Sequence, residues 1–192
     1  MTGPKVGVIA LQGAFAEHAA ALAALSAHPV EVRTPEELAG VDAIVLPGGE
    51  STTMSMLLDS SGLGDAVSAA LAEGLPAFGT CAGLILLAEE VLDGRPDQRS
   101  FGVLGVTVVR NGYGRQRDSF EADLAIPAVG REAFAGVFIR APRIARVGAE
   151  VDVLASVGDV PVLVRQGQLM AASFHPELAG DLRVHQLFLE RV

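Results

Sequence analysis

The feature that most constrains the fold is a repeated pairing of a short, unalternating apolar run with a helix-like stretch. Val6–Leu11 reads VGVIAL, a run typical of a parallel strand that is covered on both faces. A turn at Gln12 and Gly13 follows, and in Ala14–Leu25 the apolar residues recur at helical spacing. The sequence therefore predicts a strand, a turn and a helix at its start.

The same order repeats up to about residue 91. The further strands predicted in this half are Val30–Arg33, Asp42–Leu46 and a segment beginning at Pro76. The predicted helices are Pro35–Leu38, a stretch from about Thr53, Leu63–Glu73 and Leu84–Val91. Strands that alternate with helices indicate a parallel sheet with right-handed crossovers and helices on both faces.

After Gly94 most of the chain is strand-like. We expect strands near Gly102–Arg110, Ser119–Leu124, Val137–Arg140, Val151–Ser156, Pro161–Arg165 and Leu169–Phe174, and a last helix at Leu182–Val192. The 192 residues, half of them hydrophobic, suit one compact domain, and we find no linker or internal repeat. The prediction is an α/β protein with a three-layer, flavodoxin-like fold, a mainly parallel central sheet, a mixed or antiparallel C-terminal portion and a single domain over residues 1–192.

Charge and hydropathy exclude two classes of partner. Lys and Arg total 14 against 23 Asp and Glu, and the net charge is −9, with no basic run that can follow a phosphate backbone. No apolar run approaches the roughly 18 to 20 residues that cross a bilayer, and the N-terminus lacks a signal-peptide pattern. We therefore expect no nucleic acid, no membrane and a cytoplasmic protein.

The single cysteine, Cys81, lies in a Gly-x-Cys-x-Gly segment between an apolar strand and a helix. This is the sulfur counterpart of the Gly-x-Ser-x-Gly nucleophile elbow, in which a strained turn lifts the nucleophile above the sheet and the glycines avoid steric clashes. A thiol at a helix N-terminus also favours the reactive thiolate. A lone cysteine is more often a packed hydrophobe, but the flanking glycines favour a nucleophile here.

A cysteine nucleophile needs a base, and the segment SFHPEL supplies one in His175. In extended backbone, side chains i and i+2 point to the same side, so Glu177 can orient the imidazole of His175. The alternative is that His-Pro-Glu only forms a turn before the last helix. For His18, His28 and His185 we expect structural or solvated roles.

The loop after the third predicted strand, LPGGES, places two glycines at the carboxyl edge of the sheet, where open α/β folds bind ligands. A backbone N–H of this loop, at Gly49, together with that of Ala82, can stabilise an oxyanion. Arg110 and Arg140 each end a predicted strand, where a guanidinium can bind a substrate carboxylate. An ordinary turn and solvated surface arginines are the alternatives.

Together, GTCAGL, SFHPEL and LPGGESTTM resemble the class I, triad-type glutamine amidotransferases. The ordered segments ALQGAFAEH, VVRNGYGRQRDSFEADL and GVFIRAPRI narrow this to a resemblance to the glutaminase subunits of two-component pyridoxal 5′-phosphate synthases. The most specific stretches are GGESTTM and GRQxxSFE, and the segments span most of the chain.

The resemblance implies that L-glutamine is hydrolysed to L-glutamate and ammonia, and that the ammonia passes to a separate synthase subunit. It implies a large hetero-oligomer with a ring-shaped synthase core, and no metal or organic cofactor. By motif match Cys81 is the nucleophile, His175 the general base and acid, and Glu177 its orienting partner. The glutamine-binding residues implied are Gly49, Glu50, Ser51, Arg110, Ile139 and Arg140.

The chain departs from the usual family pattern at two positions, Gly112 and Tyr113, where serine and phenylalanine are common. Neither belongs to the implied triad, so we expect activity to survive. Three alternatives remain at this point: a glutaminase that serves another synthase, such as the imidazole glycerol phosphate enzyme; a cysteine peptidase or chaperone-like protein of the same broad fold; and a catalytically silent adaptor.

Overall fold

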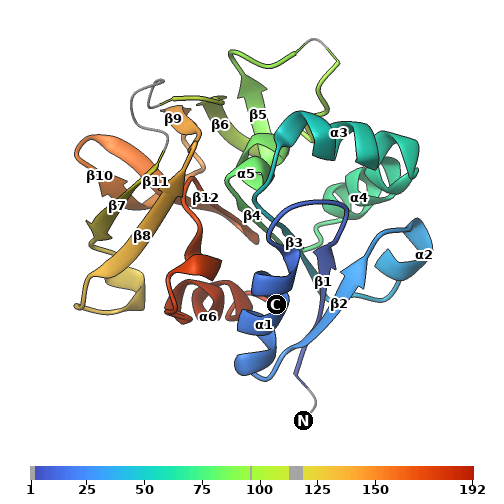
Figure 1. The fold of residues 1–192 in the computed structure, drawn as a ribbon, viewed down its shortest axis with the longest axis horizontal. Coiled ribbons are helices and arrows are strands. Elements are labelled where there is room, and N and C mark those ends of the chain that lie inside the picture. Colours follow the sequence, from blue (N-terminus) through green and yellow to red (C-terminus); the bar gives the residue numbers. More distant parts are fainter. Residues whose placement is uncertain (1–2, 96, 113–118) are drawn as a thin grey trace.

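A seven-stranded sheet forms the middle of the computed structural model, which describes residues 3–95, 97–112 and 119–192 (Figure 1). Its strand order is β10-β11-β12-β4-β3-β1-β2. The parallel strands are β1 (Lys5–Ile9), β2 (His28–Val32), β3 (Ala43–Leu46), β4 (Ala77–Thr80) and β12 (Leu169–Ala172). The antiparallel strands β11 (Val160–Gln166) and β10 (Asp152–Val157) extend one edge.

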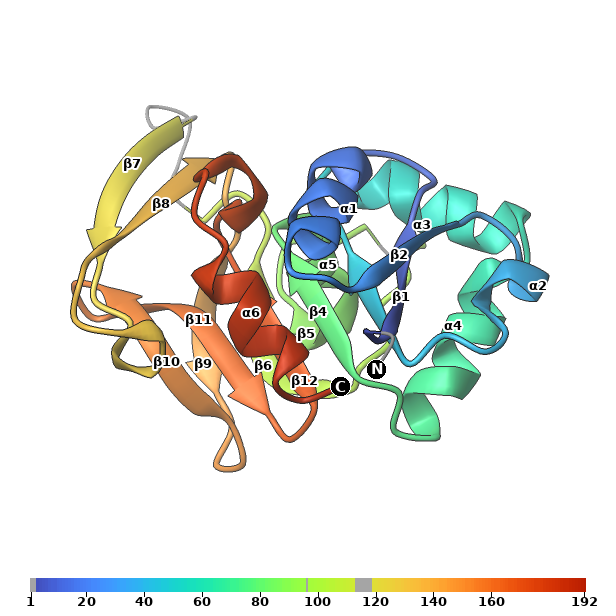
Figure 2. The same cartoon turned by 90° about the horizontal axis from the view of Figure 1, so that it is seen from below.

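Helices cover both faces of this sheet, as the two views show (Figures 1 and 2). One face packs against α1 (Phe15–Ala24) and α6 (Arg183–Leu189), and the other against α3 (Ser51–Ser60), α4 (Leu63–Ala72) and α5 (Ala82–Leu87). The four-residue helix α2 (Pro35–Leu38) joins β2 to β3.

The alternation of side chains in β3 explains why both faces are apolar. Ala43 and Val45 belong to the core beneath α1 and α6, whereas Ile44 and Leu46 belong to the core beneath α3, α4 and α5. All four are completely buried. An unalternating apolar strand therefore serves two cores at once, and the α/β fold with a mainly parallel sheet is confirmed.

Two smaller sheets complete the C-terminal half. One contains β5 (Ala88–Val91), β6 (Leu104–Val109) and β9 (Arg143–Val147), and the other is the antiparallel pair of β7 (Ser119–Leu124) and β8 (Phe134–Ile139). Two short 3₁₀ turns lie at Pro127–Val129 (η1) and Pro176–Leu178 (η2). The mixed and antiparallel C-terminal portion predicted from the sequence is thus present.

One predicted element was wrong. The sequence predicts a helix over Leu84–Val91, but α5 ends at Leu87, and Ala88–Val91 is the strand β5. The backbone of Ala88 is extended, and the segment pairs in parallel with β6. Pairing with a distant strand overrides the local apolar pattern here. The strand β9 was not predicted, and α3 begins at Ser51 rather than near Thr53.

The sheet topology brings four distant loops to one edge. The strands β12, β4, β3 and β1 are consecutive neighbours and parallel, so their carboxyl ends lie side by side. The loop after β4 begins with Cys81 and the loop after β12 contains His175, while the loop after β3 contains Gly48 and the loop after β1 contains Gln12. Within the described residues, no helix is long and apolar enough to cross a membrane.

Candidate active site

Cys81 occupies a strained turn between β4 and α5. Its φ of 49° and ψ of −99° lie outside the regions that side-chain-bearing residues ordinarily adopt. A Cβ at Gly79 would lie 2.6 Å from the carbonyl group of Gly83, and a Cβ at Gly83 would overlap the carbonyl oxygen of Leu46. The two glycines thus let the elbow fold tightly onto itself and onto β3, as the Gly-x-Cys-x-Gly pattern predicts.

His175 connects the thiol with a carboxylate. Its Nδ1 atom lies 2.7 Å from Oε1 of Glu177, and its ring and the Cβ atom of Cys81 both lie beside Gly48. The Glu177 side chain is fully buried and that of His175 is 9% exposed. Sulfur, imidazole and carboxylate therefore converge in one line, although Cys81 and His175 come from separate strands of the sheet.

This line of contacts changes the protonation of His175. Burial alone would lower its pKa, but hydrogen bonds and charge interactions with Cys81 and Glu177 outweigh burial and raise the pKa to about 10. The imidazole is therefore protonated at neutral pH.

The glycine loop after β3 packs directly on these side chains. A Cβ built at Gly48 would overlap the His175 ring and lie 3.4 Å from Cβ of Cys81, while a Cβ at Gly49 would lie 2.6 Å from Oε1 of Gln12. The glycine that touches the candidate nucleophile and base is thus Gly48, and Gly49 faces Gln12. Ala82 is the first residue of α5, so its N–H has no acceptor within that helix.

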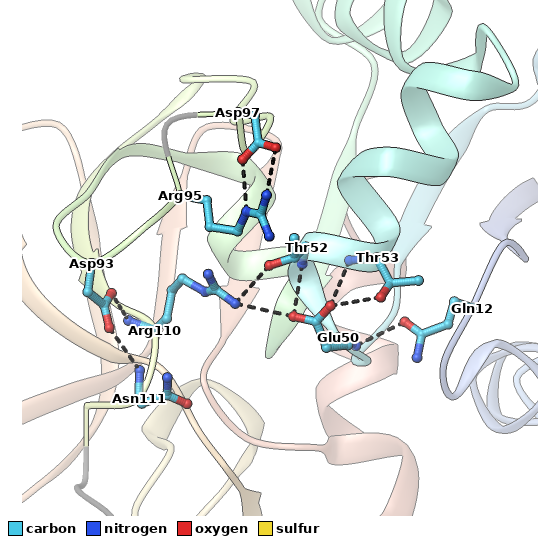
Figure 3. A network of polar contacts seen from close by, with 9 residues as sticks. All are labelled: Gln12, Glu50, Thr52, Thr53, Asp93, Arg95, Asp97, Arg110 and Asn111. Atoms are coloured by element: carbon cyan, nitrogen blue, oxygen red, sulfur yellow. Dashed lines mark hydrogen bonds and ion pairs between the residues drawn. The ribbon is translucent and has the colours of Figure 1, made fainter.

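Glu50 organises the far end of the same loop (Figure 3). Its carboxylate caps α3 by accepting hydrogen bonds from the backbone N–H groups of Thr52 and Thr53, and its own N–H donates to Oε1 of Gln12 at 2.9 Å. Burial opposes ionisation, but the hydrogen bonds from Thr53 and Thr52 hold the pKa of Glu50 below its ordinary value. The loop is therefore anchored through both the side chain and the backbone N–H of Glu50.

Arg110 reaches this capped helix from the end of β6. Its Nη2 atom donates to Oε1 of Glu50 at 3.2 Å and to Oγ1 of Thr52 at 3.0 Å (Figure 3). Its Nε atom is buried without a hydrogen-bond partner, and its backbone N–H donates to Asp93 in the turn after β5. The unexpected strand β5 thus helps to place the arginine.

The end of β8, at Ile139 and Arg140, approaches the cysteine. Sγ of Cys81 is 3.8 Å from the carbonyl oxygen of Ile139, and Arg140 has a positive φ of 44°. Ser51, the first residue of α3, is buried.

Gly112 packs so tightly on Arg143 that an added Cβ would overlap its side chain. Tyr113 and the GRQ portion of the specific stretch lie outside the described residues.

The comparison with known families narrows the alternatives. The sequence profile of the SNO glutamine amidotransferase family matches residues 8–192. The chain belongs to this glutamine amidotransferase family. Such membership confirms the resemblance drawn from the motifs and is not compatible with the peptidase-like alternative.

Relatives of this glutamine amidotransferase are similar along their whole length. A protein of Frankia alni named pyridoxal 5′-phosphate synthase subunit PdxT is 53% identical over 192 residues, which cover 100% of this chain and 96% of that protein. A crystal structure described as a glutamine amidotransferase has 53% identity and a TM-score of 0.90, covering 96% of this chain and 97% of that one. PurLQS from Thermotoga maritima has the same fold, with 17% identity, a TM-score of 0.71 and 99% coverage of both chains.

Sequence reasoning missed several residues around the site of this glutamine amidotransferase. Gln12 and Gly48 were not singled out, although the loops that carry them were. For His18 a structural or solvated role was expected; it is fully buried, and its Nε2 lies 3.3 Å from Oε2 of Glu177, a contact that was not foreseen. One signal was available, because His18 shares the apolar face of its helix with Phe15 and Leu22. Among the described residues, no group of three or more His, Cys, Asp or Glu side chains is placed to hold a metal ion.

Proposed function

We propose that this protein is the glutaminase subunit of a pyridoxal 5′-phosphate synthase. It hydrolyses L-glutamine to L-glutamate and ammonia and delivers the ammonia to the synthase subunit for vitamin B6 biosynthesis. Membership of the family and the name of the full-length relatives support this function. The observation that carries the chemistry is the line from Cys81 through His175 to Glu177 at a strained elbow.

In the first half of the reaction Cys81 acts as the nucleophile. Its thiolate attacks the side-chain amide carbon of glutamine, and the carbonyl oxygen becomes an oxyanion. Backbone N–H groups of Ala82 and Gly49 stabilise that charge. The imidazolium of His175 then gives its proton to the amide nitrogen, ammonia leaves, and a thioester on Cys81 remains.

In the second half His175 acts as a base. The imidazole, neutral after the first step, takes a proton from water while the water oxygen attacks the thioester carbon. The carbon–sulfur bond breaks, glutamate leaves, and the thiolate and imidazolium are restored. Glu177 keeps the ring in one orientation and stabilises its positive charge in both halves.

Glutamine binding falls to residues that surround the nucleophile. We assign the substrate contacts to Gly49, Glu50, Ser51, Arg110, Ile139 and Arg140. The buried, unpartnered Nε of Arg110 supports this assignment, because a guanidinium N–H left free in a buried position is available to a substrate oxygen. The contact between Cys81 and the carbonyl group of Ile139 supports the assignment of Ile139.

Ammonia in open water is protonated and lost, so hydrolysis is useful only in a complex. We propose that the synthase partner forms a ring-shaped core that carries glutaminase subunits around its outside, and that residues 1–192 act as one domain within it. We also propose that the protein acts in the cytoplasm, where a reduced Cys81 persists.

A glutamine chloroketone tests the site directly. The reagent is incubated with the protein and its synthase subunit, and mass mapping identifies the alkylated residue. We expect a single modification at Cys81, blocked by excess glutamine. Cys81→Ser should lower glutamate release at least about 1,000-fold while the circular dichroism spectrum stays unchanged. Alkylation at another residue, or substantial turnover in Cys81→Ser, would exclude the assignment.

The coupling to a partner is tested by measuring glutamate release with and without the synthase subunit. We expect the isolated protein to be a weak glutaminase and the complex to be much faster. Equal rates in the two samples would argue against a site that becomes productive on docking.

A further inference from the structure

A fully buried pair of histidines continues the line of polar side chains beyond Glu177. His18 lies on α1 and His185 on α6, two helices that lie beside each other on one face of the sheet (Figures 1 and 2). Nδ1 of His18 is 2.9 Å from Nε2 of His185, and Nε2 of His18 is 3.0 Å from Oγ1 of Thr80. The reaction described above uses neither histidine.

The two oxygens of Glu177 have different surroundings. Oε1 binds His175, whereas Oε2 faces the core. In the described part of the chain, no donor makes a well-aligned hydrogen bond with Oε2, and Nε2 of His18 is the polar atom beside it, at 3.3 Å. A buried carboxylate oxygen is unfavourable without a donor. His18 can serve as this donor only if its ring carries the proton on Nε2.

Both histidines are neutral at physiological pH. Burial lowers the pKa of His18 well below 6.5, and electrostatic interactions with the His185 and His175 rings lower it further. Burial also lowers the pKa of His185 to about 4. A neutral imidazole has one donor and one acceptor nitrogen. Each ring must therefore choose which nitrogen carries the proton.

The contacts select one arrangement. If Nδ1 of His18 carried the proton, its Nε2 lone pair would face the Glu177 carboxylate, and His185 would have to carry its own proton on Nδ1, which is buried without a partner. Two unfavourable features would result, namely repulsion and an unsatisfied N–H. In the opposite arrangement His185 donates from Nε2 to Nδ1 of His18, and Nε2–H of His18 donates to Oγ1 of Thr80, with Oε2 of Glu177 only 3.3 Å from the same nitrogen. Only an acceptor nitrogen of His185 is then left unpaired.

We propose that His18 is a positioning residue for glutamine hydrolysis, holding the second oxygen of Glu177 through its Nε2–H while His185 holds the proton of His18 in that place. This inference rests on the assignment of the Cys81, His175 and Glu177 triad. The orientation of the catalytic imidazole is thus supported from the core between α1 and α6, and not by Glu177 alone.

Three substitutions of His18 separate a donor at Nε2 from general packing. In His18→Gln the amide nitrogen reaches the position of Nε2 and can donate to Glu177. In His18→Asn it reaches only the position of Nδ1, which faces His185. His18→Leu keeps a side chain of similar size but makes it apolar, with no hydrogen-bond donor. The matched control is His28→Gln, at an exposed histidine on β2.

The assay is glutamate release by the complex with the synthase subunit, with kcat and KM measured separately. We expect His18→Leu and His18→Asn to lower kcat about tenfold with little change in KM, and His18→Gln to stay within about threefold of the unchanged protein. A role in packing alone would affect Gln and Asn alike. If His18→Leu does not fold, the comparison of Gln with Asn still decides.

Two outcomes would overturn the inference: equal kcat values for the Gln and Asn variants, or a folded His18→Leu variant with unchanged kcat. A Cys81→Ser sample run alongside separates this failure from a wrong triad. If Cys81→Ser is inactive while the His18 variants behave normally, the triad stands and only the role of His18 is lost.

Discussion

Nδ1 of His175 lies 2.7 Å from Oε1 of Glu177, with only Pro176 between the two residues. The backbone of His175 has φ of −106° and ψ of 85°, and the 3₁₀ turn η2 begins at the next residue. This contact is therefore set by local geometry. The contact of His175 with Cys81, in contrast, depends on the pairing of β12 with β4.

Replacing either partner of His175 should change its titration. In the unchanged protein we expect the His175 Cε1–H resonance to titrate near pH 10, because Cys81 and Glu177 both favour the imidazolium. In Cys81→Ser and in Glu177→Gln the midpoint should fall. The resonance of His28, which is exposed on β2, serves as the internal reference. A midpoint close to 6.5 in the unchanged protein would contradict the ion pair.

The same proton links stability to pH. The folded protein holds it more tightly than the unfolded chain, whose histidines titrate near 6.5. The stabilisation is therefore complete below pH 6.5 and is lost as the pH rises towards about 10. Urea unfolding should show that the stability difference between the unchanged protein and Glu177→Gln narrows over this range.

His185 should make the protein sensitive to mild acid. Its pKa of about 4 in the folded state lies below that in the unfolded chain, so the unfolded chain binds a proton first as the pH falls from 6.5. Between pH 7 and pH 5 this amounts to about 2 kcal/mol of lost stability. Urea unfolding of His185→Gln should show a smaller loss, and His28→Gln the full loss. An equal loss of stability in the unchanged protein, His185→Gln and His28→Gln would exclude His185 as the origin of the acid sensitivity.

Adding one methyl group at Gly48 should disable the site without unfolding the protein. The Cβ of Gly48→Ala would overlap the His175 ring and must displace it. Misplacing a catalytic group by about 1 Å lowers kcat about 100-fold. Gly40→Ala is the matched control, because its Cβ would meet no atom within 4 Å, although its φ of 72° makes alanine unfavourable. Gly48→Ala should therefore lose glutamate release while it remains folded, whereas Gly40→Ala should keep glutamate release and unfold at a lower temperature.

Much of the fold was predictable because each short apolar run contributes side chains to two hydrophobic cores, one on each face of the sheet. The strand at Ala43–Leu46 lies as expected, since its side chains alternate between the two faces of the sheet. The helix predicted over Leu84–Val91 was wrong in its second half, and Arg143–Val147 was not predicted as a strand. Both segments are strands through pairing with β6, a contact that no local pattern in either segment indicates.

The candidate site shows the same division. Gly79, Gly83 and the spacing of His175 and Glu177 are local signals, and they predicted the elbow and the imidazole–carboxylate pair. The contact of His18 with Glu177 depends on how α1 packs against the sheet and η2, and no spacing in the sequence reports it. All the roles assigned in glutamine binding stay predictions, namely those of Gly49, Glu50, Ser51, Arg110, Ile139 and Arg140.

Glu50 should affect both the stability of α3 and the affinity for glutamine. Glu50→Ala removes the cap from Thr52 and Thr53, which costs about 1 kcal/mol, and removes the carboxylate that holds Arg110. We expect KM for glutamine to rise about tenfold, because the guanidinium loses its orientation. Glu50→Gln keeps a capping oxygen and should lose less stability than Glu50→Ala.

A matched loss of capping elsewhere separates the two effects of Glu50. Thr34→Ala removes the side-chain cap of α2, which follows β2 at the outer edge of the sheet. Urea unfolding should show a comparable loss of about 1 kcal/mol, while KM stays unchanged. If Thr34→Ala raised KM as much as Glu50→Ala does, general loss of stability would explain both variants, and the link from Glu50 through Arg110 to the substrate would have to be abandoned.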